Sequence, residues 1–197
     1  MYKLFYYPRN ASWAPHLVLS EMGVDFELVL VDRKSNEQKS PEYLLLNPSG
    51  RIPTLADENT IIFESAAICL YLCEKHPELG LIPVAGSAER AKFYQWLFYL
   101  NSTLQPEFMV YRYPEKHTIG EETKKISIAQ ESRVTQMFSL INNELEGKEF
   151  LVGSNITVCD YFLFMLSHWA SGFSHPPLSF NHLGSYLRSM AKREAVV

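Results

Sequence analysis

Three side chains that could stabilise an anion lie close together near the start of the chain: Tyr6, Asn10 and Ser12. A hydroxyl or amide donor favours the charged form of a neighbouring thiol or carboxyl group, and the free N–H groups at the start of a helix add to this effect. Two structural alternatives stand beside this interpretation. Ser12 has the residue type of a helix N-cap, and Tyr6 that of a core tyrosine whose hydroxyl is satisfied internally.

A second candidate lies in the segment NPSGRIPTL, residues 47–55, where a proline interrupts the start of an apolar run. Proline cannot donate a hydrogen bond to a neighbouring strand, so it is confined to strand starts, edges and bulges. The two prolines and the glycine of this segment predict a tight turn that leads into a strand. We expect a cis peptide between Ile52 and Pro53, with the backbone N–H and C=O of Ile52 left for an outside partner.

Other groupings of reactive side chains do not predict a site. Cys69 and Cys73 share one helix face, where free cysteine usually fills core space. His168, His175 and His182 recur every seven residues, but two prolines interrupt any common helix, so we expect no metal site. The total of three cysteines is odd, which argues against a disulfide framework and for a reducing compartment.

Hydrophobic patterning predicts the elements that would position these residues. Short apolar runs over 3–7, 25–32, 54–57 and 60–64 predict strands, and the patterns over 12–23 and 65–76 predict helices. Strand, helix and strand in this order favour a parallel βαβ unit with a right-handed crossover. Residues 1–76 are therefore expected to form an α/β domain with the element order βαβ-ββα.

The rest of the chain predicts a linker and a helical domain. Residues 77–87 carry two prolines and two glycines, which favours a linker. Beyond it we expect an aromatic-rich helix with a break at Pro106, an amphipathic helix over 121–146, a mostly buried helix in ITVCDYFLFMLSHWA and a last helix from about Asn181. Residues 88–197 are therefore expected to be all-helical.

The composition narrows the class of partner. With 47% hydrophobic and 20% charged residues, the chain is typical of a globular protein. Its net charge of -4 does not favour nucleic acid or an anionic membrane as a partner. No apolar run approaches the roughly 20 residues that span a bilayer, and the first ten residues lack the pattern of a secretory signal. These features, together with the odd number of cysteines, predict a cytoplasmic protein.

The order of the elements resembles that of the cytosolic glutathione S-transferase family, in which a thioredoxin-like domain precedes an all-helical one. Three motifs carry the resemblance in the right order: NPSGRIPTL before the cis-proline strand, FESAAICLYL at the start of the second helix, and ITVCDYFLF in a buried helix. The last motif would form a capping box between Thr157 and Asp160. The segments LFYYPRNASWAPHLVLSEMGVDFEL and YFLFMLSHWA are similar to the bacterial beta class.

The resemblance implies a glutathione site in the first domain. Ile52, which precedes Pro53, would pair its backbone with the cysteinyl unit as an added strand does. The γ-glutamyl carboxylate would lie at the start of the second helix, where Ser65 would donate and Glu64 would accept from the substrate's amino group. The alternative is that these two residues only cap the helix. Candidates for the glycyl carboxylate are Lys34, Lys39 and Arg51.

Conjugation needs the glutathione sulfur as a thiolate, so the site must lower the pKa of that thiol. The resemblance implies that a residue of the first turn does this, with Ser12 as the first choice, then Tyr6, then Asn10. The beta class carries a cysteine where this chain has Ala11, and often a histidine where it has Gln105. This departure argues against disulfide chemistry through a cysteine of the protein.

The function implied by the resemblance is a detoxifying transferase that adds glutathione, as a co-substrate, to apolar electrophilic small molecules. Two alternatives stay open: a non-catalytic module that binds protein partners, and a glutathione-dependent isomerase. The resemblance also implies a homodimer. Three aromatic residues could either line the electrophile pocket or fill the core: Phe108, Tyr111 and Tyr113.

Overall fold

The computed structural model describes residues 1–196, which form two compact units. Unit 1 comprises Met1–Ile82 and the C-terminal residues from Glu194, and unit 2 comprises Pro83–Arg193. The division after Ile82 falls inside the expected linker, 77–87. Within the described part of the chain, no helix is both long and apolar enough to cross a membrane.

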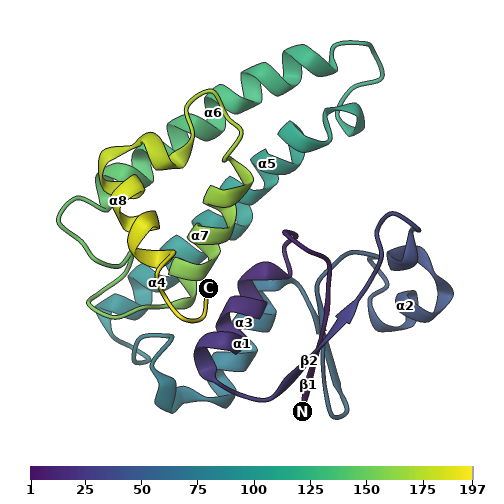
Figure 1. The fold of residues 1–197 in the computed structure, drawn as a ribbon, viewed down its shortest axis with the longest axis vertical. Helices are drawn as coiled ribbons and strands as arrows, with labels where there is room; N and C mark the ends of the chain where they lie inside the picture. The colour runs from purple at the N-terminus through teal and green to yellow at the C-terminus, as the bar shows by residue number, and fades with distance from the viewer. Residues whose placement is uncertain (197) are drawn as a thin grey trace. The chain divides into compact units, whose positions relative to one another are not determined.

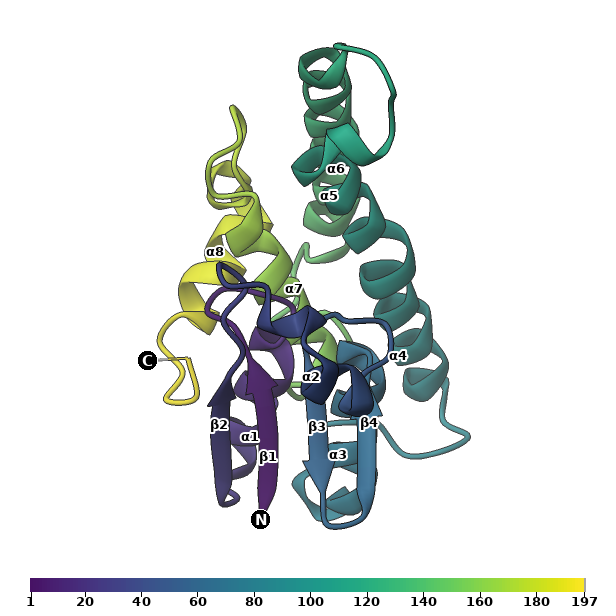
Figure 2. The ribbon, with the colours of Figure 1, turned by 90° about the vertical axis from the view of Figure 1, so that its right-hand side faces the viewer.

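Unit 1 is built on a four-stranded sheet in the order β2-β1-β3-β4, which Figure 2 shows side by side. The strands are β1 (Tyr2–Tyr6), β2 (Phe26–Leu30), β3 (Thr54–Asp57) and β4 (Thr60–Phe63). β1 is parallel to β2 and antiparallel to β3, and β3 is antiparallel to β4. The predicted thioredoxin-like sheet is confirmed. Because β1 and β2 are parallel, the turns that follow them lie at the same end of the sheet, where both strands have their carboxyl ends.

Two helices cover one face of this sheet, and a shorter helix lies on the other side (Figure 1). The covering pair, α1 (Trp13–Met22) and α3 (Ser65–Lys75), pack against each other. α1 ends at Gly23, whose φ of 64° lies in the left-handed region that glycine adopts without strain. Pro15 lies in the first turn of α1, where a helix tolerates its missing N–H.

The short helix, α2 (Pro41–Leu46), is absent from the sequence prediction. Its start has clear local causes, since the Ser40 hydroxyl accepts the N–H of Tyr43 and Pro41 occupies the first helical turn. Six residues are too few for an apolar period to emerge, which explains the omission. The observed order is thus β1-α1-β2-α2-β3-β4-α3.

Unit 2 is helical, as predicted. α4 (Ala88–Phe98), the π-helical segment η3 (Tyr99–Leu104) and α5 (Gln105–Arg112) follow one another directly, and α6 (Thr123–Glu144) runs back beside α5 (Figure 1). The expected break at Pro106 takes the form of this π-helical segment, which changes the hydrogen-bond register just before the proline. Single 3₁₀ turns occur in both units: Glu37–Lys39 and Pro77–Leu79 in unit 1, and Pro114–Lys116 and Pro177–Ser179 in unit 2.

The core of unit 2 is built around α7 (Val158–Trp169), which α8 (Asn181–Met190) follows. Nine of the twelve residues of α7 are buried. The fully buried Asp160 carboxylate accepts from the Thr157 N–H (2.7 Å) and hydroxyl (3.0 Å), the Leu151 N–H (2.9 Å) and the Tyr186 hydroxyl (2.8 Å). The predicted capping box is confirmed. Burial raises the pKa of Asp160, although the hydrogen bonds oppose this shift.

Candidate functional site

The turn between β1 and α1 is closed by Ser12. Its hydroxyl donates to the C=O of Tyr7 (3.1 Å) and accepts from the Tyr7 N–H (3.3 Å), and its side chain is only 1% exposed. The Asn10 amide oxygen accepts the N–H of Ala11 at 2.6 Å. The NH₂ group of Asn10 makes no hydrogen bond within residues 1–196. Tyr6, at the end of β1, is half-buried. The three predicted donors thus lie within one short segment at the start of α1.

The loop before β3 is fixed by hydrogen bonds from two side chains that the sequence analysis did not identify. The Tyr43 hydroxyl and the Asn47 side-chain amide both donate to the C=O of Arg51, each at 2.8 Å. The Tyr43 hydroxyl also lies 2.8 Å from Thr54 Oγ1 at the start of β3. Burial raises the pKa of Tyr43, so its hydroxyl remains a protonated donor. These bonds fix the backbone that leads into the cis peptide.

The Ile52–Pro53 peptide is cis, as predicted. The Ile52 side chain is 8% exposed and packs with Val31 and Tyr43, while Tyr7 packs against the same cluster. In contrast, the backbone N–H and C=O of Ile52 make no hydrogen bond to any part of the described chain. The loop therefore lies beside the turn after β1 and carries an unpaired donor and acceptor.

The start of α3 is joined directly to the turn after β1. Ser65 is 4% exposed, and its hydroxyl donates to the C=O of Ala11 at 2.9 Å. Glu64, the residue before it, has a φ of 76°, in a region that non-glycine residues adopt only at an energetic cost. The first turn of α3 holds no acidic residue, and the Glu64 side chain makes no capping hydrogen bond to it, so the first N–H groups of the helix are left without a side-chain acceptor. This helix start is therefore suited to an anion.

The basic candidates are exposed. The Lys39 ammonium donates to the C=O of Ser49 at 3.2 Å, which places it over the loop 47–51. Gly50 makes this approach feasible, because a Cβ at this position would lie 2.5 Å from Lys39 Nζ and the φ there is +60°. Arg51 and Lys34 also have exposed side chains. Three or more metal-ligating side chains gather nowhere in residues 1–196.

The aromatic candidates belong to unit 2. Phe108 is 1% exposed, so its burial assigns it to the core, one of the two roles that the sequence left open. Tyr111 is partly exposed, and so is Tyr113, whose ring lies 4.3 Å from the Lys116 ammonium. The rings around Phe108 are Phe138, Trp169 and Phe173, at centroid distances of 5.7 to 6.0 Å.

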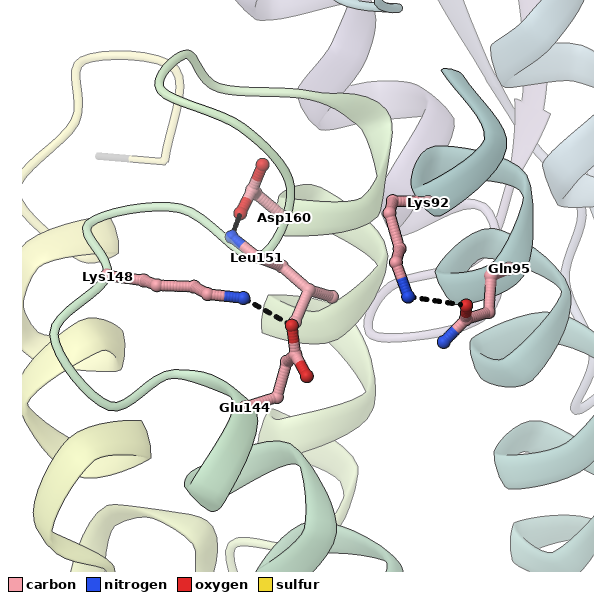
Figure 3. Close-up of polar contacts among 6 residues, drawn as sticks. All are labelled: Lys92, Gln95, Glu144, Lys148, Leu151 and Asp160. Carbon is pink, nitrogen blue, oxygen red and sulfur yellow. Dashed lines mark hydrogen bonds and ion pairs between the residues drawn. The ribbon is translucent and has the colours of Figure 1, made fainter. Parts of the chain in front are cut away.

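An open groove of about 960 Å³ runs along α4, η3 and the end of α6. Phe98 and Leu140 line it with side chains that are 59% and 50% exposed. Polar side chains interrupt this apolar lining. Figure 3 shows Gln95 bonded to Lys92 on α4, and Glu144 paired with Lys148 after α6, near the Leu151–Asp160 bond. Of the residues predicted to bind glutathione, none lies in this groove.

Two other sequence signals for the site were available but unused. Asn47 lies within the NPSG turn, where asparagine side chains commonly bond to nearby backbone. Pro15 follows Ala11 at the spacing of a helical hydrogen bond, which could have indicated a carbonyl without a helical donor. Tyr43 carried no such signal, because its role depends on α2.

Comparisons with known proteins agree with this arrangement over the whole chain. Residues 1–74 match the family model of the glutathione S-transferase N-terminal domain, and residues 93–194 that of the C-terminal domain. Glutathione S-transferase GstA of Escherichia coli O157:H7 is 32% identical, over 98% of this chain and 94% of that protein.

Two solved structures give the same picture. The bacterial beta class glutathione S-transferase of Sphingomonas chungbukensis is 31% identical, with a TM-score of 0.85 over 98% of this chain and 94% of that one. A sphingomonad glutathione S-transferase complexed with glutathione is 30% identical, with a TM-score of 0.84 and the same coverage of both chains.

Proposed function

The chain belongs to the glutathione S-transferase family, and on that premise we propose that it is a cytoplasmic enzyme that adds glutathione to apolar electrophilic small molecules. One observation carries the proposal. In unit 1, the unpaired Ile52 backbone and the start of α3 both adjoin the turn that holds Ser12. A peptide-like ligand with a carboxylate at one end and a thiol in the middle matches these features. Glutathione is such a ligand, and it acts as a co-substrate.

Binding uses three parts of this junction. The cysteinyl unit pairs with the backbone N–H and C=O of Ile52, next to Pro53, as an added strand would. The γ-glutamyl carboxylate lies at the start of α3, by Ser65, where backbone N–H groups and the helix dipole favour an anion. The exposed Glu64 carboxylate accepts from the γ-glutamyl amino group. Lys39 and Arg51 are the cations available to the glycyl carboxylate.

Reaction requires the thiolate. A thiol of ordinary pKa, about 8.5, is only a few per cent ionised at pH 7, so donors at the sulfur must favour the charged form. Ser12 is the first candidate, and its hydroxyl would turn from the Tyr7 carbonyl to the sulfur. Asn10 offers an unbonded NH₂ group, and Tyr6 a half-buried hydroxyl. The thiolate then forms a bond to the electrophilic carbon, and the leaving group departs with the electron pair.

The rest of the proposal concerns the second substrate and the assembly. Ala11 takes the position where we align the beta-class cysteine, so the reaction is conjugation by the glutathione sulfur rather than exchange with a protein thiol. Tyr111 and Tyr113 are the partly exposed aromatics that would contact an apolar electrophile. We also propose a homodimer, supported by apolar side chains exposed on each unit.

The test is retention on immobilised glutathione, followed by a conjugation assay with a chloronitrobenzene. We expect retention, elution by free glutathione, and thioether formation that saturates with glutathione. Retention without thioether would instead support the non-catalytic module. Glutathione-dependent isomerisation of a double bond, with no glutathione consumed, would support the isomerase. Failure of the protein to bind glutathione would overturn the proposal.

A further inference from the structure

The segment that follows α7 places an aromatic side chain in the core of unit 2 but has few backbone hydrogen bonds of its own. Phe173 is 5% exposed, and its N–H donates to the C=O of Ala170 at 3.1 Å. The next N–H, that of Ser174, donates to Glu131 Oε1 on α6 at 2.6 Å. Within the described residues, no other hydrogen bond ties the backbone of residues 172–175 to α5 or α6. The Glu131 carboxylate is therefore the polar anchor of this segment on α6.

The anchored segment supports the ring of Tyr111. The centroids of the Tyr111 and Phe173 rings lie 4.7 Å apart, and the Phe108 ring lies 5.7 Å from that of Phe173. Phe108 and Phe173 are buried, whereas Tyr111 is partly exposed. Packing of one aromatic ring on another favours particular relative orientations. The position of Phe173 therefore determines how Tyr111 presents its exposed surface.

The other half of this pair is also fastened to α6, which runs beside α5 (Figure 1). Glu107 of α5 accepts a hydrogen bond from the side-chain amide of Gln130. One turn earlier on α6, the Ser127 hydroxyl donates to the C=O of Tyr111 at 3.4 Å. Glu131 follows Gln130 directly in the sequence. Neighbouring residues of α6 thus hold the two segments whose aromatic rings meet.

We propose that Glu131 is a positioning residue for the second substrate: its carboxylate holds the Ser174 N–H and so keeps Phe173 against Tyr111, the ring on which an aromatic electrophile stacks. The inference rests on the proposed function, which assigns Tyr111 to the electrophile, and deepens it by identifying what orients that ring. Glu131 acts through the two rings and touches neither substrate. A planar aromatic electrophile gains from a well-oriented ring face, whereas a small aliphatic one does not.

The first test needs no glutathione and follows hydrogen exchange of the Ser174 amide by NMR. Glu131→Ala removes the acceptor, so this N–H should exchange about 5- to 30-fold faster, the effect of losing one hydrogen bond. Glu131→Gln keeps a side-chain oxygen as acceptor and should exchange within about 3-fold of the parent. An unchanged exchange rate in Glu131→Ala would mean that the carboxylate does not hold the segment, and the inference would be wrong.

The second test compares two electrophiles in the conjugation assay. Glu131→Ala should raise KM for a chloronitrobenzene about 2- to 12-fold, the contribution of one aromatic pair, while KM for glutathione stays at the parent value. KM for iodomethane, which has no ring to stack, should change less than about 2-fold. In a Tyr111→Ala background, Glu131→Ala should raise KM for the chloronitrobenzene by less than about 2-fold, because the ring through which it acts is gone.

A matched control lies on the same helix. The Asn142 side-chain oxygen also accepts backbone N–H groups from a later segment, those of His182 at 3.0 Å and Leu183 at 3.1 Å. Asn142→Ala should therefore loosen the start of α8 but leave the Ser174 exchange rate and KM for the chloronitrobenzene unchanged. If it raises that KM as much as Glu131→Ala does, the effect is a general loss of stability and the positioning role is wrong.

The conservative variant separates the anchor from the charge. Glu131→Gln should have the parent KM for both electrophiles, because the amide oxygen still accepts the Ser174 N–H. If Glu131→Gln is as impaired as Glu131→Ala, the negative charge acts on the substrate directly, and the inference is overturned.

These outcomes also distinguish the inference from the proposed function. If the parent conjugates glutathione but Glu131→Ala keeps the parent KM for the chloronitrobenzene, the positioning role is overturned and the function stands. If the parent does not bind glutathione, the proposed function and the role of Glu131 toward an electrophile are both overturned, whatever the exchange rates show.

Discussion

At the start of β3, the backbone proposed to bind glutathione is held in place by the phenol of Tyr43. The Tyr43 hydroxyl bonds to the C=O of Arg51 and to Thr54 Oγ1. Tyr43→Phe removes both bonds, so we expect the free energy of unfolding to fall by about 1–2 kcal/mol. The loop that carries Ile52 should also become less ordered, raising KM for glutathione up to about tenfold while kcat changes little.

Tyr2→Phe is the matched control for that prediction. It also removes a phenol bond in unit 1, to His76 Nε2 at 2.9 Å, but at the beginning of β1 rather than at the glutathione loop. Its KM should equal that of the parent. An unchanged KM in Tyr43→Phe, or an equal rise in both variants, would contradict a specific role for Tyr43.

Ser12 gives the second prediction at this scale. If its hydroxyl turns to the sulfur, Ser12→Ala should raise the pKa of the bound thiol by about one unit or more, equivalent to roughly 1.4 kcal/mol. A raised pKa leaves less thiolate at neutral pH, so conjugation should fall about tenfold at pH 7 and recover as the pH rises. Thiolate absorbance of bound glutathione measures this directly. Asn10→Ala and Tyr6→Phe are the parallel variants, and whichever one shifts the titration identifies the donor.

Individual helices show which parts of the fold the sequence could predict. α1 and α7 were predictable because proline, glycine and the Thr157–Asp160 pair mark their ends. α2 was not, since six residues do not complete two turns and no apolar stripe forms. The cis peptide was predictable from its local sequence, whereas the two bonds that hold the Arg51 carbonyl required α2 to be in place. Ser65 illustrates the same limit, because its acceptor lies 54 residues earlier in the chain.

The start of α7 carries the prediction at the scale of an element. Asp160 accepts four hydrogen bonds at full burial, and an amide at that position would direct an NH₂ group at some of these donors. We expect Asp160→Asn to lower the free energy of unfolding by about 2–4 kcal/mol in denaturant titrations. Asp57→Asn is the control in unit 1, where the carboxylate accepts from the Tyr71 hydroxyl and is partly exposed. Asp57→Asn should lower the free energy of unfolding by less than about 1.5 kcal/mol.

The same carboxyl group has a predictable pH dependence. Burial raises the pKa of Asp160 above its ordinary value of 3.8, so the native state binds the proton more tightly than the unfolded state. Its contribution to stability is therefore fully present below pH 3.8 and is lost as the pH rises through the raised pKa. The stability difference between the parent and Asp160→Asn should shrink over that window. A difference that grows with pH would mean that hydrogen bonding, rather than burial, determines this pKa.

Each unit of the molecule presents apolar surface that its own fold does not cover. In unit 1, β4 is an edge strand, and Ile61 and Phe63 on it are 46% and 41% exposed. In unit 2, Phe98 and Leu140 border the groove along α4 and α6. An unpaired edge and an apolar groove are the kinds of surface that association covers. A second copy of the chain offers both at once.

The proposed homodimer gives the last prediction. Solution mass should be twice the 22.7 kDa of one chain, measured by light scattering across a dilution series. Phe98→Glu and Phe63→Glu each place a charge on surface that the dimer would bury, so each should raise the dissociation constant at least about 30-fold, from a penalty of 2 kcal/mol or more. Leu45→Glu is the control, because Leu45 is 84% exposed and belongs neither to β4 nor to the residues that line the groove, so it should leave the mass unchanged. If the unsubstituted protein has the mass of a single chain at every concentration, the proposed homodimer is wrong. Equal dissociation by all three variants would trace the effect to added charge instead of a defined interface.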